Sequence, residues 1–235
     1  MTDDFLSYKY IFQFDSGHTI DFEIKLDRRT LDYQPPREQI DSDWSVFNEL
    51  PCSDCYQTEA DATCPVTRNI AYVVQAFNDV ASYTKVNVMV VGDERTISHD
   101  DLSVQQALSS LLGIIMVTSG CKDLDKLRPI SRLHLPFASI EETIFRASAI
   151  YLLAQYYRKK CGLEPDWDLE KMPAIYSRID SINTQICKRL REVSSDDANM
   201  NAIIVLDTMA QMMPHSIEAG LPQFEGLFAA HLKDD

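Results

Sequence analysis

Near its start the chain reads Tyr8-Lys-Tyr-Ile-Phe-Gln-Phe-Asp-Ser-Gly-His-Thr-Ile-Asp-Phe-Glu-Ile-Lys-Leu26, and this stretch decides which fold class we predict. Apolar and polar side chains alternate on both sides of Asp15-Ser-Gly-His18, which supplies turn residues. Alternation with a period of two is typical of strands that bury one face. The stretch therefore predicts an antiparallel hairpin with its charged side chains toward solvent.

Working outward from the hairpin, helical patterns dominate the rest of the chain. Pro65 suits the first turn of a helix that carries apolar residues from Val66 to Val80, and a second strand pair is predicted over 86–99. Capping boxes begin at Ser103 and Ser139. Further helices are expected over 175–193, 197–213 (ended by Pro214) and 224–232. The sequence predicts a single α+β domain over 1–235, with an antiparallel ββαββ sheet unit in 1–102 and a largely helical half in 103–235.

Composition excludes several classes of protein. The chain of 235 residues has a net charge of −14 and few clusters of Lys and Arg, so we expect neither nucleic acid nor an anionic membrane surface as a partner. No apolar run approaches the roughly 20 residues that span a bilayer. The start lacks the pattern of a secretory signal, so we expect a cytoplasmic protein with free thiols. Common nucleotide-binding, α/β-hydrolase and zincin motifs are absent.

A group of cysteines is the main candidate for site chemistry. Cys52, Cys55 and Cys64 lie within thirteen residues, and a Cys-x-x-Cys pair can direct two sulfurs to one metal ion. A structural zinc site needs four ligands, and Cys121 in the loop after Gly120 is the best fourth. His134 is the rival fourth ligand and His18 a more distant one. An iron–sulfur cluster is less favoured because the short ferredoxin-type run of cysteines is absent.

A redox Cys-x-x-Cys has its first thiol at a helix N-terminus, whereas the helix here begins after Cys64, so Cys52 and Cys55 do not fit a redox pair. Two alternatives to zinc stay open for these cysteines. Cys64 or Cys121 could act as a reactive thiolate in an enzyme or redox sensor. The other alternative is that the thiols bind nothing. Cys161 and Cys187 are assigned to packing in helices.

A second group of polar residues consists of His134, Glu142 and Arg146. Together these side chains could transfer protons or bind an anion. The alternative interpretation is structural: Glu142 caps its helix, Arg146 pairs with Glu142, and His134 is hydrogen-bonded beneath the loop.

A narrow apolar stripe runs along the predicted helix over 175–193. Its spacing of three and four residues indicates packing against one neighbouring helix, within the fold or in a homodimer. The leading hypothesis is thus a protein-interaction or regulatory module with a structural zinc site. The alternatives are a metal- or thiol-dependent enzyme or sensor that uses Cys64 or Cys121 with His134 and Glu142, and a ligand-binding module without metal.

The chain also resembles an uncharacterised family of bacterial cytoplasmic proteins. The resemblance rests on Cys52, Cys55 and Cys64-Pro65, and on a segment with Thr118-Ser-Gly-Cys121, Leu127-Arg-Pro129, His134-Leu-Pro-Phe-Ala138, Glu141-Glu-Thr143 and Arg146. It covers most of the chain and implies that the cysteine segment and the loop around Cys121 and His134 form one site. It implies no activity. Lys122 stands where the family often has proline, so the local loop geometry differs from the family pattern.

Overall fold

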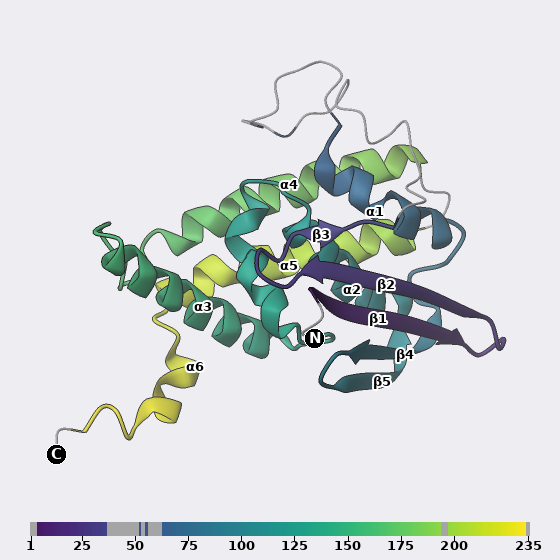
Figure 1. Ribbon diagram of the computed structural model, residues 1–235. Coiled ribbons are helices and arrows are strands. Elements are labelled where there is room, and N and C mark those ends of the chain that lie inside the picture. Colours follow the sequence, from purple (N-terminus) through teal and green to yellow (C-terminus); the bar gives the residue numbers. More distant parts are fainter. Residues whose placement is uncertain (1–3, 37–51, 53–54, 56–62, 194–196, 234–235) are drawn as a thin grey trace.

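The computed structural model describes residues 4–36, 52, 55, 63–193 and 197–233. Within this part of the chain, one antiparallel sheet has the strand order β3-β2-β1-β4-β5 (Figure 1). The strands are β1 (Phe5–Phe14), β2 (Thr19–Asp27), β3 (Tyr33–Gln34), β4 (Lys85–Gly92) and β5 (Thr96–Ser103).

The alternation of β1 places its aromatic side chains in the core. Tyr10 pairs with Phe22 of β2 on one side and with Val90 of β4 on the other, and all three are buried. On the opposite face, Lys9 forms an ion pair of 3.0 Å with Asp21. The sheet thus buries one face and exposes the other, as a period of two requires.

The remaining elements are helical. They are α1 (Pro65–Ala76), α2 (Val104–Thr118), the 3-10 helix η2 (Leu124–Leu133), α3 (Ile140–Lys160), α4 (Met172–Val193), α5 (Ala198–Glu218), α6 (Pro222–Glu225) and the 3-10 turn η3 (Gly226–Phe228).

Helix α2 occupies the centre of the molecule. It contacts α1, η2, α5, β4 and β5, so it lies between the sheet and the helical half. Leu108, Leu111, Leu112 and Ile115 have no exposed surface. The helix begins with the capping box predicted at Ser103. One hydrophobic core therefore runs from the sheet through α2 to α4 and α5.

The predicted α+β class is confirmed, with four local differences. The short strand β3 adds to the predicted ββαββ order, and the ten-residue η2 was not predicted. The helix expected over 224–232 is instead the short helix α6 followed by the turn η3. The prediction that Pro214 ends a helix is wrong, because α5 continues through it to Glu218. A proline removes one intrahelical hydrogen bond and crowds the preceding turn, yet the helix continues here with the neighbouring Met213 fully buried.

The apolar stripe over 175–193 packs inside the chain. Ile179, Ile182, Ile186 and Leu190 are buried, and α4 lies along α5. The intramolecular alternative accounts for this stripe, and the packing offers no support for a homodimer through it. Among the described helices, none has the combined length and apolarity needed to cross a bilayer.

The central position of α2 predicts a large effect of truncating its side chains. Leu112→Ala should lower the free energy of unfolding by about 2–5 kcal/mol, because Leu112 is fully buried and its removal leaves a cavity. The control Leu227→Ala, at a side chain that is 70% exposed, should change it by less than about 0.5 kcal/mol. Urea denaturation measures both values, and equal losses would contradict the assignment of α2 as the core helix.

Candidate functional site

Four cysteines from three parts of the chain line one small cavity. Cys52, Cys55, Cys64 and Cys121 surround a volume of about 20 Å³, together with Arg178 and Arg189 of α4. All four cysteines are free thiols. The cavity is about the size that holds a single water molecule or ion. The structure thus brings together the four cysteines that we predicted from the sequence as metal ligands.

Local structure explains how each cysteine reaches this cavity. The N–H of Cys55 donates to the carbonyl of Cys52 at 3.1 Å, which keeps these two cysteines close together. Cys64 is the N-cap of α1, because Pro65 occupies the first helical position. Cys121 follows Gly120, whose positive φ of 84° lets the chain turn away from the end of α2.

The electrostatics of the cysteine cavity favour the neutral thiols of Cys52 and Cys121 until a cation is present. Burial is the main cause that raises the pKa of Cys52 to about 11, with smaller contributions from the neighbouring sulfurs of Cys64, Cys55 and Cys121 that Arg189 opposes. Burial also raises the pKa of Cys121, although the backbone N–H groups of Leu124 and Asp123 favour its thiolate. Four thiolates therefore need a nearby positive charge in order to coexist here.

The side chains around the cysteine cavity are not arranged as metal ligands in this structure. Within the described residues, no group of three or more His, Cys, Asp or Glu side chains is close enough to hold a metal ion. His134 lines a different cavity, and His18 lies at the β1–β2 turn against Phe14. Cys161 is exposed and Cys187 is buried outside the cavity lining.

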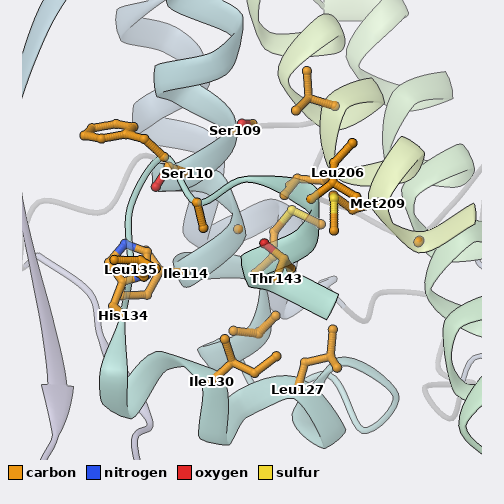
Figure 2. A pocket seen from close by; sticks show the side chains of 18 of the residues that line it. Ser109, Ser110, Ile114, Leu127, Ile130, His134, Leu135, Thr143, Leu206 and Met209 are labelled. Atoms are coloured by element: carbon orange, nitrogen blue, oxygen red, sulfur yellow. The ribbon is translucent and has the colours of Figure 1, made fainter. Parts of the chain in front are cut away.

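A second, much larger cavity lies between α2, η2, α3 and α5. Its volume is about 580 Å³, within the range of small-molecule sites. Figure 2 shows Ser109, Ser110 and Ile114 of α2 on one side of it and Leu206 and Met209 of α5 on another. Leu127 and Ile130 of η2 close the remaining side (Figure 2).

His134 is held at the wall of this larger cavity by the aromatic side chains of β1. Its Nε2 lies 2.5 Å from the hydroxyl of Tyr10, which also lies 2.9 Å from the hydroxyl of Ser110. The ring of Tyr8 packs edge-on against the imidazole. Burial, together with the charge of Arg146, lowers the pKa of His134 to about 3, so the imidazole is neutral near pH 7.

Glu142 and Arg146 have separate local roles. Glu142 accepts the Ser139 N–H in the capping box of α3, at 2.7 Å. Arg146 donates through Nη2 to the carbonyls of Ile130 and Leu133, at 3.3 and 3.0 Å. These two side chains form no ion pair with each other. Of the predicted group, His134 and Arg146 line the larger cavity and Glu142 does not.

Sequence reasoning missed the larger cavity itself. Two signals could have indicated it. Small residues (Ser109, Ser110 and Gly113) interrupt the otherwise apolar α2, and they line the cavity. Asn183 stands among Ile179, Ile182 and Ile186 on the buried side of α4, where a polar side chain is unusual.

The neutral state of His134 predicts a dependence of stability on pH. Its folded pKa lies below that of an unfolded histidine, so the stability it contributes is present above about pH 6.5 and is lost as the pH falls toward 3. The slope should not exceed about 1.4 kcal/mol per pH unit, because a single imidazole takes up at most one proton. His134→Gln lacks this proton linkage. Relative to wild type, its free energy of unfolding should therefore rise as the pH falls from about 7 to about 5. Urea denaturation at several pH values measures the difference, and a difference independent of pH would contradict the assignment.

Comparison with known proteins gives a family but no activity. No curated protein matches the chain. No solved structure matches it either. A family model matches residues 7–229, which includes both the sheet and the helical half. The chain therefore belongs to the family described as a domain of unknown function, DUF6901.

Proposed function

We propose that the protein is a non-catalytic interaction module in which Cys52, Cys55, Cys64 and Cys121 bind one structural zinc ion. The observation that carries the proposal is that these cysteines, spread over 70 positions of the sequence, line a single cavity of about 20 Å³. Four thiolates are a common ligand set of structural zinc. In this role the metal would tie Cys52, Cys55 and the start of α1 to the loop that follows α2.

The charges around the cavity support a tetrathiolate centre. Zinc with four thiolates carries a net charge of about −2, which is costly to bury alone. Arg189 has 5% of its surface exposed and lines the same cavity, as does Arg178. Arg178 is also paired with Asp123 at 2.9 Å. The guanidinium of Arg189 would therefore compensate part of the charge that the sulfurs introduce.

The size of the cavity favours one ion over a cluster and a structural role over a catalytic one. A volume of about 20 Å³ holds one atom-sized guest, which fits a single metal ion better than an iron–sulfur cluster. A catalytic zinc keeps an open coordination position beside a substrate pocket. In the proposed site the four sulfurs would fill all four coordination positions, and His134 and Arg146 line the other cavity.

Metal analysis of the purified protein tests this proposal. We expect about one zinc per chain by elemental mass spectrometry. Cys64→Ser and Cys121→Ser should each remove most of the zinc and lower the free energy of unfolding by roughly 3 kcal/mol or more, because the bound metal stabilises the folded state.

Two serine variants serve as matched controls. Cys161→Ser replaces an exposed thiol and should change neither zinc content nor stability. Cys187→Ser replaces a buried thiol outside the cavity, so it should destabilise the fold without releasing zinc. The proposal fails if purified wild type carries no zinc and its stability is unchanged by a chelator.

Helix α3 provides the surface through which we propose that the module binds, with a second copy of the chain as its partner. Several large apolar side chains on α3 are exposed, including Leu153 (54%), Tyr156 (47%) and Tyr157 (59%). The helix begins with Glu141 and Glu142 and ends with Arg158, Lys159 and Lys160. An antiparallel pair of α3 helices would place the acidic start of one beside the basic end of the other.

This interface predicts self-association that depends on α3. Sedimentation equilibrium at micromolar concentration should detect a dimer that Tyr157→Glu dissociates, because the substitution introduces a charge into an apolar contact. The control Tyr83→Glu changes a side chain that is 77% exposed outside α3, and should leave the dimer intact. A wild-type protein that remains monomeric would rule out this partner.

A further inference from the structure

The walls of the larger cavity are mainly apolar, and the charged side chain among them is positive. Among the described residues that line it there is no Asp, Glu or Lys, and the one Arg is Arg146. This is unexpected in a chain with 36 acidic and 22 basic residues. The cavity therefore suits a ligand whose body is apolar and whose charged group is negative.

Arg146 has donors left for such a charged group. Its hydrogen bonds within the described residues are made by Nη2 alone, to the carbonyls of Ile130 and Leu133. These bonds fix the guanidinium at the cavity wall, while Nε and Nη1 remain able to donate. A guanidinium in this setting recognises a carboxylate with good geometry.

The neighbouring groups leave the positive charge of Arg146 uncompensated by an ion pair. Glu142 is close enough to raise the pKa of Arg146, but it serves the capping box and forms no ion pair with it. Burial works in the opposite direction and lowers the pKa of Arg146. His134 is neutral and adds no charge of its own. A bound anion would therefore pair with an existing, partly buried cation.

A second observation independently indicates a ligand. Asn183 is 1% exposed and lines the cavity, and neither Oδ1 nor Nδ2 forms a hydrogen bond with the described residues. Its amide acts as a donor toward Asp207 and lowers the pKa of that carboxyl, although the contact falls outside strict hydrogen-bond geometry. Buried polar groups are nearly always hydrogen-bonded, so the amide oxygen of Asn183 is available to a polar atom of an occupant.

The remaining walls of the cavity indicate which chemical class the body of the ligand belongs to. They are mainly aliphatic side chains from α2, η2 and α5, such as Ile114, Leu127, Ile130, Leu206 and Met209 (Figure 2). Sugars and nucleotides need many hydrogen-bonding partners, and phosphates need several donors or cations. One arginine among aliphatic walls matches a monoanion with a flexible hydrocarbon body.

We propose that this cavity binds an amphipathic carboxylic acid, with its carboxylate on Arg146 and its aliphatic body between α2, η2 and α5. The site is separate from the cysteine cavity, so this proposal stands whether or not the protein binds zinc. It adds a small-molecule ligand to the protein, and neither the proposed zinc site nor the proposed α3 interface depends on that ligand.

Competition against a neutral apolar fluorophore tests the proposal with three probes of equal tail length: decanoate, decanol and decyltrimethylammonium, each below its aggregation concentration. We expect saturable binding of decanoate, with one molecule per chain. Its affinity should exceed that of decanol by about tenfold or more, the size expected for a charged hydrogen bond. The cationic probe should bind more weakly than decanol.

Substitutions then test separately the contact of the carboxylate with Arg146 and the contact of the aliphatic body with the cavity walls. Arg146→Gln should weaken decanoate about tenfold and leave decanol within about twofold, while Arg146→Lys should retain part of the preference for the carboxylate. Arg132→Gln changes an exposed arginine of η2 outside the cavity lining and serves as the matched control, with no effect expected. Met209→Trp should weaken decanoate and decanol alike, because it fills the body of the cavity.

Three results would overturn the proposal. They are the absence of saturable decanoate binding to wild type, equal affinities for decanoate and decanol, and an unchanged decanoate affinity in Arg146→Gln. Circular dichroism of each variant establishes that it is folded. If Arg146→Gln does not fold, the comparison of the three probes on wild type and on Arg146→Lys still decides the question.

Discussion

The burial of α2 is the constraint on which the other parts of this structure depend. The helix is enclosed by the sheet on one side and by α5 on the other, with α1 and η2 along its flanks. Burial of apolar side chains is the dominant favourable contribution to folding, and α2 has six with no exposed surface. Once α2 is fixed, the positions of both cavities follow, because each uses part of this helix or the loop after it.

The 3-10 helix η2 connects the two cavities. Cys121, which lines the cysteine cavity, comes three residues before η2, and His134 follows its last residue. Between them, Leu127 and Ile130 line the larger cavity. Arg128 of η2 is also paired with Asp32 and Asp125, which ties η2 to the loop between β2 and β3. A metal at Cys121 would therefore stabilise the start of the segment that forms one wall of the ligand cavity.

Much of the fold could be predicted from local patterns. The hairpin of β1 and β2, the capping boxes of α2 and α3 and the apolar stripe of α4 are all short-range signals, and the structure contains each of them. Pro214 misled the prediction, because the cost of one lost hydrogen bond is local while the packing that outweighs it is not. The same limit applies to η2, since 3-10 segments have no strong periodic signature in the sequence.

Of the two cavities, the sequence allowed one to be anticipated better than the other. The convergence of Cys121 on Cys52, Cys55 and Cys64 could be anticipated from the types of residue and from the helix end at Gly120. The larger cavity is harder to anticipate, because its volume depends on the space that α2, α3 and α5 leave between them. The small residues of α2 and the buried Asn183 indicate where it lies but not its size. Arg146 was identified as polar and near His134, but its role depends on the absence of acidic side chains from a lining that comes from several elements.

X-ray absorption at the zinc edge measures directly whether four sulfurs hold one metal ion. If Cys52, Cys55, Cys64 and Cys121 bind zinc together, its first shell should consist of four sulfur atoms at about 2.3 Å. A shell that contains nitrogen or oxygen at about 2.0–2.2 Å, in place of one or more sulfurs, would contradict the assignment of Cys52, Cys55, Cys64 and Cys121 as the complete ligand set.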